Sequence, residues 1–217
     1  MSHLLTDRTK VRRIPDRGKY QEHELFEILD SSFLCHIAFC EANDLPVLIP
    51  TAYGHDKGFL YIHGATTSRM IKRLEEGAPL CFCVTIVDAL VLARSAFHHS
   101  LNYRSVIVFG TAEKVEGEEK NRGLKIISDQ ILKGRWEEAR PPNKKELKAT
   151  TVLKIQVIEG SAKVRTGPPK DDAEDYSLDT WAGILPLRQQ PGKPVDDPTL
   201  LKPIPLPDSV LNFLKNG

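Results

Sequence analysis

The chain has 217 residues, of which 41% are hydrophobic and 27% are charged, and its formal net charge is +1. This size and composition are typical of one globular domain, so we expect residues 1–217 to form a single domain. The neutral charge balance and the 7% of aromatic residues argue against a nucleic-acid-binding protein, and no apolar run is long enough to cross a membrane.

The N-terminal segment, residues 1–20, is polar and basic and lacks the apolar core of a secretory signal, so we expect a cytoplasmic protein. Such a segment is either a solvated arm or an arm laid over a partner subunit. Residues 21–30 then form a short amphipathic helix, because Leu25, Ile28 and Leu29 recur at helical spacing.

From Ser32 the hydrophobic period changes from helical to alternating, which predicts β-structure. Turn residues separate three strands, and the two prolines of the second, Pro46 and Pro50, place it at an edge or make it irregular. A helix capped by Thr66, Thr67 or Ser68 follows these strands. Further strands are predicted later in the chain. The predicted strands cover residues 33–40, 46–53, 59–63, 80–87, 89–96, 105–114 and 151–158.

Two more helices are predicted, one over residues 118–132 and a short one in which Asn143 is the cap and Glu146 lies three residues on. Residues 166–217 are rich in Pro, Asp and Gly and form a C-terminal extension. About six short strands with one inserted helix indicate a mainly β fold with a closed antiparallel sheet. Helices are too few for a doubly wound sheet.

The first candidate for chemistry is the segment from His63 to Arg69. A strand ends here, Gly64 lets the backbone approach another group, and hydroxyls and Arg69 open a helix. Free N–H groups and a guanidinium suit a phosphate, although a capped helix with a surface arginine would look the same. The usual nucleotide-binding glycine loops are absent.

The second candidate is the segment 93–105, which places cations, imidazoles, hydroxyls and aromatic residues between two strands. Such a loop can hold an aromatic heterocycle. The adjacent His98 and His99 have no carboxylate close in sequence, and the cysteines show no C-x-x-C spacing, so we predict no metal site. Motifs of serine hydrolases and zinc proteases are also absent.

Taken together, the segments in chain order resemble the flavin-nucleotide-binding proteins of the pyridoxamine 5'-phosphate oxidase superfamily, in the branch that includes nitroimidazole-reductase-like proteins. The matching segments are Arg12 to Gly18, Ile49 to Gly54, Tyr61 to Ala65, Ser68 to Met70, Leu92 to Ser100, Asn102 to Val106, Phe109-Gly110, Gly134 to Trp136, Ala139 to Pro141, Ser161 to Pro169 and Trp181 to Gly183.

The resemblance implies a six-stranded antiparallel split β-barrel with flanking helices that forms a homodimer with FMN at the subunit interface. It implies that the second strand follows the flavin ring, that the turn after the third strand grips the phosphate, and that residues entering the sixth strand reach the cofactor, from the other subunit. The cofactor-binding residues implied in this way are Ile49, Pro50, Thr51, Ala52, Tyr53, His63, Gly64, Thr67, Ser68, Arg69, Tyr103, Arg104 and Ser105.

The sequence departs from true pyridoxamine-phosphate oxidases after Arg69, where Met70 and Ile71 replace Lys-Gly, and at the C-terminus, so a different small-molecule substrate is expected. The expected function is an FMN-dependent oxidoreductase in which His63 is the candidate proton donor, because imidazole titrates near neutrality. His63 could equally be a structural histidine. The alternatives are a nitroreductase or quinone-type reductase, a non-catalytic flavin carrier or sensor, and a haem protein in which His98 or His99 binds iron.

Overall fold

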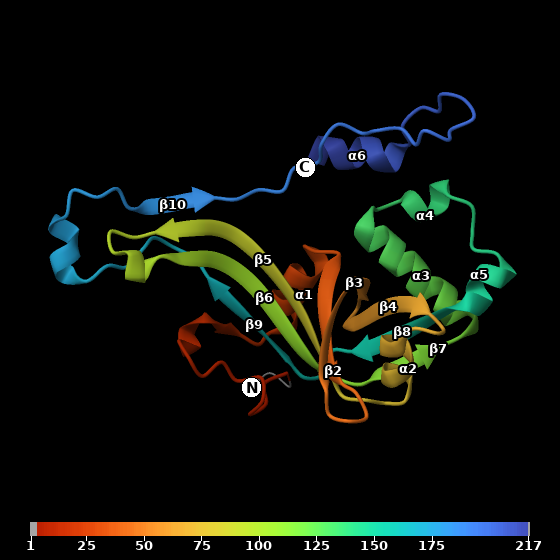
Figure 1. The fold of residues 1–217 in the computed structure, drawn as a ribbon, viewed down its shortest axis with the longest axis horizontal. Coiled ribbons are helices and arrows are strands. Elements are labelled where there is room, and N and C mark those ends of the chain that lie inside the picture. The colour runs from red at the N-terminus through yellow and green to blue at the C-terminus, as the bar shows by residue number, and fades with distance from the viewer. Residues whose placement is uncertain (1–3, 217) are drawn as a thin grey trace.

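The computed structural model describes residues 4–216, and its main feature is one curved antiparallel sheet with helices packed against it (Figure 1). The strand order is β1-β9-β6-β5-β2-β3-β4-β8-β7, and β10 pairs with β5 outside this path. The ten strands are β1 (Gly18–Lys19), β2 (Leu34–Cys40), β3 (Pro46–Asp56), β4 (Phe59–Ala65), β5 (Leu80–Leu92), β6 (Ser100–Gly110), β7 (Ala112–Val115), β8 (Thr150–Gln156), β9 (Gly160–Arg165) and β10 (Gly183–Pro186).

Six α-helices and three short 3₁₀ helices accompany the sheet in the described residues. They are η1 (Pro15–Arg17), α1 (Glu22–Asp30), α2 (Arg69–Glu75), η2 (Ala96–His98), α3 (Gly117–Ile131), α4 (Arg135–Glu138), α5 (Lys144–Ala149), η3 (Ala173–Ser177) and α6 (Asp208–Asn216). The predicted capping box of α5 is confirmed, because Asn143 accepts from the Glu146 N–H at 2.9 Å and Glu146 accepts from the Asn143 N–H at 2.8 Å.

The mainly antiparallel β fold is confirmed, but the sheet has ten strands in the described chain rather than six, and it does not close on itself. Part of the difference comes from β1, β9 and β10, which are too short or too polar to show alternation. In contrast, β5 is one strand where two were predicted. The register shifts between Val87 and Ala89, so a bulge at Asp88 absorbs the polar residue without ending the strand.

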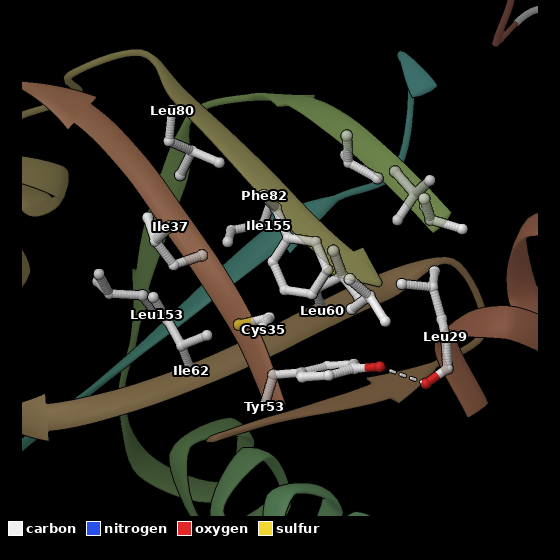
Figure 2. Packing of buried hydrophobic residues seen from close by; sticks show 14 of the residues in the cluster. Leu29, Cys35, Ile37, Tyr53, Leu60, Ile62, Leu80, Phe82, Leu153 and Ile155 are labelled. Atoms are coloured by element: carbon white, nitrogen blue, oxygen red, sulfur yellow. Dashed lines mark hydrogen bonds between the residues drawn. The ribbon is translucent and has the colours of Figure 1, made fainter. Parts of the chain in front are cut away.

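The main core lies inside the curved sheet, and buried side chains of α1 and α2 pack into it. Figure 2 shows part of this core. Side chains from seven strands meet there, including Ile37, Tyr53 and Phe82, each of which is fully buried. The Tyr53 ring meets the Phe82 ring edge-on at 5.0 Å, and its hydroxyl donates to the Leu29 carbonyl at the end of α1. This contact fixes the middle of β3 against the helix that precedes the sheet.

A second core lies under α3, which covers the outer face of β3, β4 and β8. Tyr61, Ile127 and Val152 form its centre. Gly54 allows the helix to come this close, because a Cβ at this position would lie 2.7 Å from the α3 backbone at Ile126. The helix therefore packs closely against β3 around Gly54.

The N-terminal segment is attached to the sheet rather than solvated in its described part. Leu4 is fully buried and accepts a hydrogen bond from the Gly160 N–H, Arg8 pairs with Glu159, and β1 extends the sheet beside β9. The expectation of a solvated arm is therefore wrong at Leu4, which is an apolar anchor, and at β1, whereas residues 12–16 between them are exposed. Contact of this segment with a partner subunit stays a prediction.

The C-terminal extension runs along the outside of the molecule. β10 pairs with the far end of β5, and the chain then crosses to α6, where Ser209 bonds Glu138 of α4 (Figure 1). No helix within residues 4–216 combines the length and apolar character that a membrane span requires.

Candidate functional site

The candidate site lies where β3 separates from β4. Residues 46–52 of β3 pair with β2, whereas residues 53–56 pair with β4 in a register that begins at Tyr53. Continued by one residue, this register would set Ala52 opposite His63, but the last pair that forms is Tyr53 with Ile62. We call this place the split. Along the split, one edge of β3 has no strand partner in the described chain, and we call it the open edge.

The backbone at the open edge offers hydrogen-bonding groups that have no partner strand in the described chain. Tyr53 donates its N–H to the Phe33 carbonyl at 3.2 Å, so its backbone faces the β2 side. Because successive residues of a strand point their backbone groups in opposite directions, those of Leu48, Pro50 and Ala52 point away from β2. A flat ligand with polar ring atoms could therefore extend the sheet at this edge.

The five β3 residues implied as cofactor contacts divide into two groups. Pro50 and Ala52 direct their backbone to the open edge, whereas Ile49, Thr51 and Tyr53 direct theirs to β2. The side chain of Ile49 packs on the core and Tyr53 is buried, while the Thr51 hydroxyl lies 3.4 Å from the Ala52 carbonyl. Within this strand, Pro50 and Ala52 are the residues best placed for backbone contacts.

His63 lies directly across the split. Its Nδ1 is buried and has no hydrogen-bond partner among the described residues, and burial lowers the pKa of the imidazole below 6.5. A buried polar atom without a partner costs free energy, so such atoms mark places where a ligand or water completes the structure. The imidazole is neutral at pH 7 and can accept or donate a hydrogen bond without gaining charge.

The turn from β4 into α2 presents two unused hydroxyls. The Ser68 N–H bonds the Ala65 carbonyl at 2.9 Å, and the Thr66 N–H bonds the Ala149 carbonyl at 3.0 Å, so the turn is fixed at both ends. Ser68 is the N-cap of α2, but its side chain makes no capping bond. Thr67 beside it is exposed. Both hydroxyls are therefore available to a ligand.

Gly64 has a packing role that its position in the sequence did not suggest. A Cβ there would lie 2.8 Å from a side-chain carbon of Ile71, one of three buried residues of α2. In the structure, this glycine allows α2 to pack closely against β4.

Arg69, the implied phosphate contact, lies at the start of α2 and pairs with Glu41 at 2.9 Å. The arginine side chain is 64% exposed and the glutamate 24%. Glu41 follows β2 and lies 28 positions earlier in the chain, so no local pattern around Arg69 indicates this partner. An anion bound by Arg69 would compete with this carboxylate for the guanidinium group.

The three implied contacts on β6 lie apart from the split within one chain. β5 and β2 separate β6 from β3, which at about 4.8 Å per strand places them about 14 Å apart. Arg104 makes a forked pair with Asp88, with its closest contact at 2.8 Å, and this pairing raises the pKa of the guanidinium. The Ser105 hydroxyl donates to the Lys163 carbonyl at 3.3 Å, and Tyr103 is half-buried.

The two adjacent histidines lie at the far end of the β5–β6 hairpin. His98 Nε2 is 3.3 Å from a carboxylate oxygen of Asp172, and His99 Nε2 is 3.3 Å from the Ala93 carbonyl. Asp172 is 74 positions away in the sequence, which is why no carboxylate was expected near these histidines.

Comparisons with known proteins agree with this architecture. A family model described as pyridoxamine 5'-phosphate oxidase matches residues 21–164. The flavocytochrome Anf3 from Azotobacter vinelandii is similar at 39% identity and a TM-score of 0.88, over 96% of this chain and 97% of that one. A protein from Mycobacterium smegmatis described as binding FAD and heme is similar at 35% identity and a TM-score of 0.87, over 91% of this chain and 97% of that one.

A more distant solved structure, a candidate 5-nitroimidazole antibiotic resistance protein from Bacteroides thetaiotaomicron, shares the fold. It is 20% identical with a TM-score of 0.59, over 68% of this chain and 86% of that one. No curated protein sequence matched the chain.

Proposed function

The chain belongs to the pyridoxamine 5'-phosphate oxidase family, and from that premise we propose that it binds a flavin nucleotide at the split and uses it in redox reactions of a small molecule. The observation that carries the proposal is the unpartnered, buried Nδ1 of His63, a residue whose position in β4 would be opposite Ala52 if the β3–β4 pairing continued across the split. A flavin ring has both donors and acceptors along its edge, so it matches these two sets of groups. The relatives described as a flavocytochrome and as binding FAD support the assignment.

The residues at the split would hold the two ends of the nucleotide in different ways. The backbone of Pro50 and Ala52 would bond the ring edge, and His63 would bond a polar ring atom. The hydroxyls of Thr67 and Ser68 and the guanidinium of Arg69 would hold the phosphate, since a charged forked donor suits a phosphate. Occupation of this site requires Arg69 to exchange its contact with Glu41 for the phosphate.

The flavin supplies the electron-transfer chemistry, and the protein binds and orients it. Because burial keeps His63 neutral near pH 7, its proposed role is to hold a proton in a hydrogen bond to the ligand rather than to carry a positive charge. The absence of the substrate-phosphate residues expected of true pyridoxamine-phosphate oxidases supports a different small-molecule substrate.

The experiment is a spectrum of the purified full-length protein, followed by chromatography of the cofactor released on denaturation. We expect flavin absorption, and FMN as the released form, since one guanidinium with two hydroxyls matches a single phosphate. Release of FAD would mean that the chain binds the flavin named for the Mycobacterium smegmatis relative instead of FMN. The proposal of a flavin nucleotide at the split would then still hold. A colourless protein that takes up neither FMN nor FAD would contradict the proposal.

Catalysis is distinguished from flavin carriage or sensing by anaerobic reduction of the loaded protein. We expect NADH or NADPH to reduce the bound flavin, and an added nitroaromatic or quinone to reoxidise it over many cycles. A flavin that neither nucleotide reduces, and that no acceptor reoxidises, would identify a carrier or sensor.

Haem binding is a second candidate function, supported by the two relatives that are described as a flavocytochrome and as binding FAD and heme. His63 has an unpartnered ring nitrogen, whereas His98 and His99 have their Nε2 atoms near Asp172 and Ala93. We therefore expect that His63 would be the histidine that binds the iron of any bound haem. Haem added to the protein should give a Soret band that His63→Ala abolishes and His99→Ala retains.

We also propose a homodimer, with the β6 residues of one subunit facing the split of the other. The outward face of the sheet carries Leu34, Leu48 and Ile107, which are 48%, 61% and 36% exposed, and a second copy would cover them. Sedimentation should give a mass near twice 24.3 kDa. A stable, flavin-loaded monomer would contradict this arrangement.

A further inference from the structure

A cluster of metal-ligand side chains lies away from the split, where the tip of the β5–β6 hairpin meets the C-terminal extension. His98 ends η2 at the hairpin tip, and Asp172 and Asp175 lie at η3 of the extension. One ligand atom from each of the three lies within 4.8 Å of the other two. The closest pair, His98 Nε2 and an Asp172 oxygen, is separated by 3.3 Å.

The neighbouring residue Asp171 fixes the two segments in this position. Its carboxylate accepts hydrogen bonds from the backbone N–H groups of Arg94 and Ser95 at 2.9 and 3.1 Å, and from the Arg94 guanidinium at 3.2 Å. The Asp171 side chain is fully buried, and the Arg94 guanidinium also lies over the Tyr176 ring at 4.9 Å. The buried Asp171 carboxylate therefore holds together two segments far apart in the sequence, while the Asp172 side chain beside it is 74% exposed.

The two cluster carboxylates are brought together without a compensating cation. Side chains three residues apart in a 3₁₀ helix lie on the same side, which aligns Asp172 with Asp175. Neither carboxylate has a lysine or arginine ion partner within residues 4–216, and Arg94 pairs with Asp171 through Nη1. Asp172 is the N-cap of η3, a position where aspartate normally caps the helix, yet its side chain makes no capping bond.

We propose that His98, Asp172 and Asp175 bind a divalent transition metal ion such as Zn²⁺. Zinc binds histidine nitrogen and carboxylate oxygen at about 2.0–2.2 Å, so tetrahedral ligands lie about 3.4 Å apart, close to the 3.3 Å between His98 and Asp172. The imidazole favours zinc and its neighbours over calcium or magnesium, which prefer oxygen ligands. A water molecule completes the coordination.

The bound ion would fasten the C-terminal extension to the hairpin. The hairpin tip and η3 are otherwise joined by the contacts of Asp171 and Arg94, and β10 pairs with β5 further along. The metal would add a cross-link between residues 98 and 172, and so would suppress opening of the segment between β9 and β10. This proposal does not depend on flavin binding.

The test is a zinc titration of the full-length protein after treatment with EDTA, in competition with a chromophoric chelator. We expect one tight equivalent per chain, and slower amide hydrogen exchange in residues 171–177 when zinc is bound. His98→Ala and Asp172→Asn should each weaken binding at least about 100-fold, because loss of a group that merely orients a ligand already costs about 10- to 100-fold.

His99→Ala is the matched control, since this neighbouring imidazole lies near the Ala93 carbonyl and outside the cluster. It should leave zinc affinity and stoichiometry unchanged. Circular dichroism of each variant separates loss of a ligand from loss of the fold. The proposal is overturned if folded His98→Ala binds zinc as tightly as the unaltered protein, if calcium binds in preference to zinc, or if no zinc binds.

Discussion

The Arg69–Glu41 pair gives the sharpest test of how the phosphate is held. A hydrogen bond to a charged group contributes about 1.5–3 kcal/mol, so Arg69→Ala should weaken FMN binding about 10- to 100-fold at about 1.4 kcal/mol per factor of ten. Glu41→Gln should have the opposite effect, because it frees the guanidinium from a contact at 2.9 Å. A half-exposed ion pair contributes about 0.2–1 kcal/mol, which corresponds to an affinity up to about 5-fold higher.

The assay is quenching of flavin fluorescence on titration with protein, carried out with FMN and with riboflavin, which lacks the phosphate. Arg69→Ala should weaken FMN binding and leave riboflavin binding nearly unchanged. Lys72→Ala, an exposed residue of the same helix, is the matched control and should affect neither. The reasoning is refuted if Arg69→Ala affects both ligands equally or neither of them, or if Glu41→Gln weakens FMN binding.

Three further predictions concern the scaffold of the site. Tyr53→Phe should lower the unfolding free energy by only about 0.5–1.5 kcal/mol, because Gln130 still donates to the Leu29 carbonyl. Removal of both donors should cost more than the sum of the two single losses. An unchanged urea midpoint for Tyr53→Phe would contradict this. Burial lowers the pKa of His63, so the imidazole binds a proton more readily in the unfolded chain than in the folded one. The free energy of unfolding should therefore fall as pH decreases below about 6.5, and His63→Gln should remove this pH dependence. Identical profiles of stability against pH for the two proteins would contradict the prediction. Gly54→Ala should cost about 1–3 kcal/mol, because the added Cβ would meet the α3 backbone at 2.7 Å, and an unchanged melting temperature would argue against that contact.

The unpaired side of residues 46–52 in β3 could be predicted from the prolines of this strand. A proline has no N–H to donate, so it fits a strand only where its nitrogen faces away from a partner. In the structure Pro50 stands opposite His36, and its backbone nitrogen faces the open edge. The same two prolines that indicated an irregular strand thus mark the edge at which the flavin is proposed to bind.

Other elements could not be predicted because their causes are not local. Asp88 was interpreted as a break between strands, but its charge is compensated by Arg104 on the neighbouring strand, and a bulge keeps the strand continuous. β10 has only four residues and forms because the outer edge of β5 offers unpaired backbone groups. Neither the partner charge nor the free edge is visible in the sequence around these residues.

In the candidate site, too, the local features could be predicted from the sequence and the long-range contacts could not. His63, Ser68 and Arg69 could be predicted to lie near one another because they belong to one short segment. The structure places His63 near the end of β4, and Ser68 and Arg69 at the start of α2. Glu41 and the carboxylates near His98 were missed because long-range packing brings them there from other parts of the chain. The roles of the β6 residues stay a prediction that requires the second subunit.

A structure of the protein crystallised with FMN tests the central claim most directly. The account predicts electron density for the ring system along Leu48 to Ala52 of β3, with a polar ring atom within hydrogen-bond distance of His63 and the phosphate at Ser68 and Arg69. Density for the flavin at any other place, with His63 Nδ1 still without a partner, would contradict it.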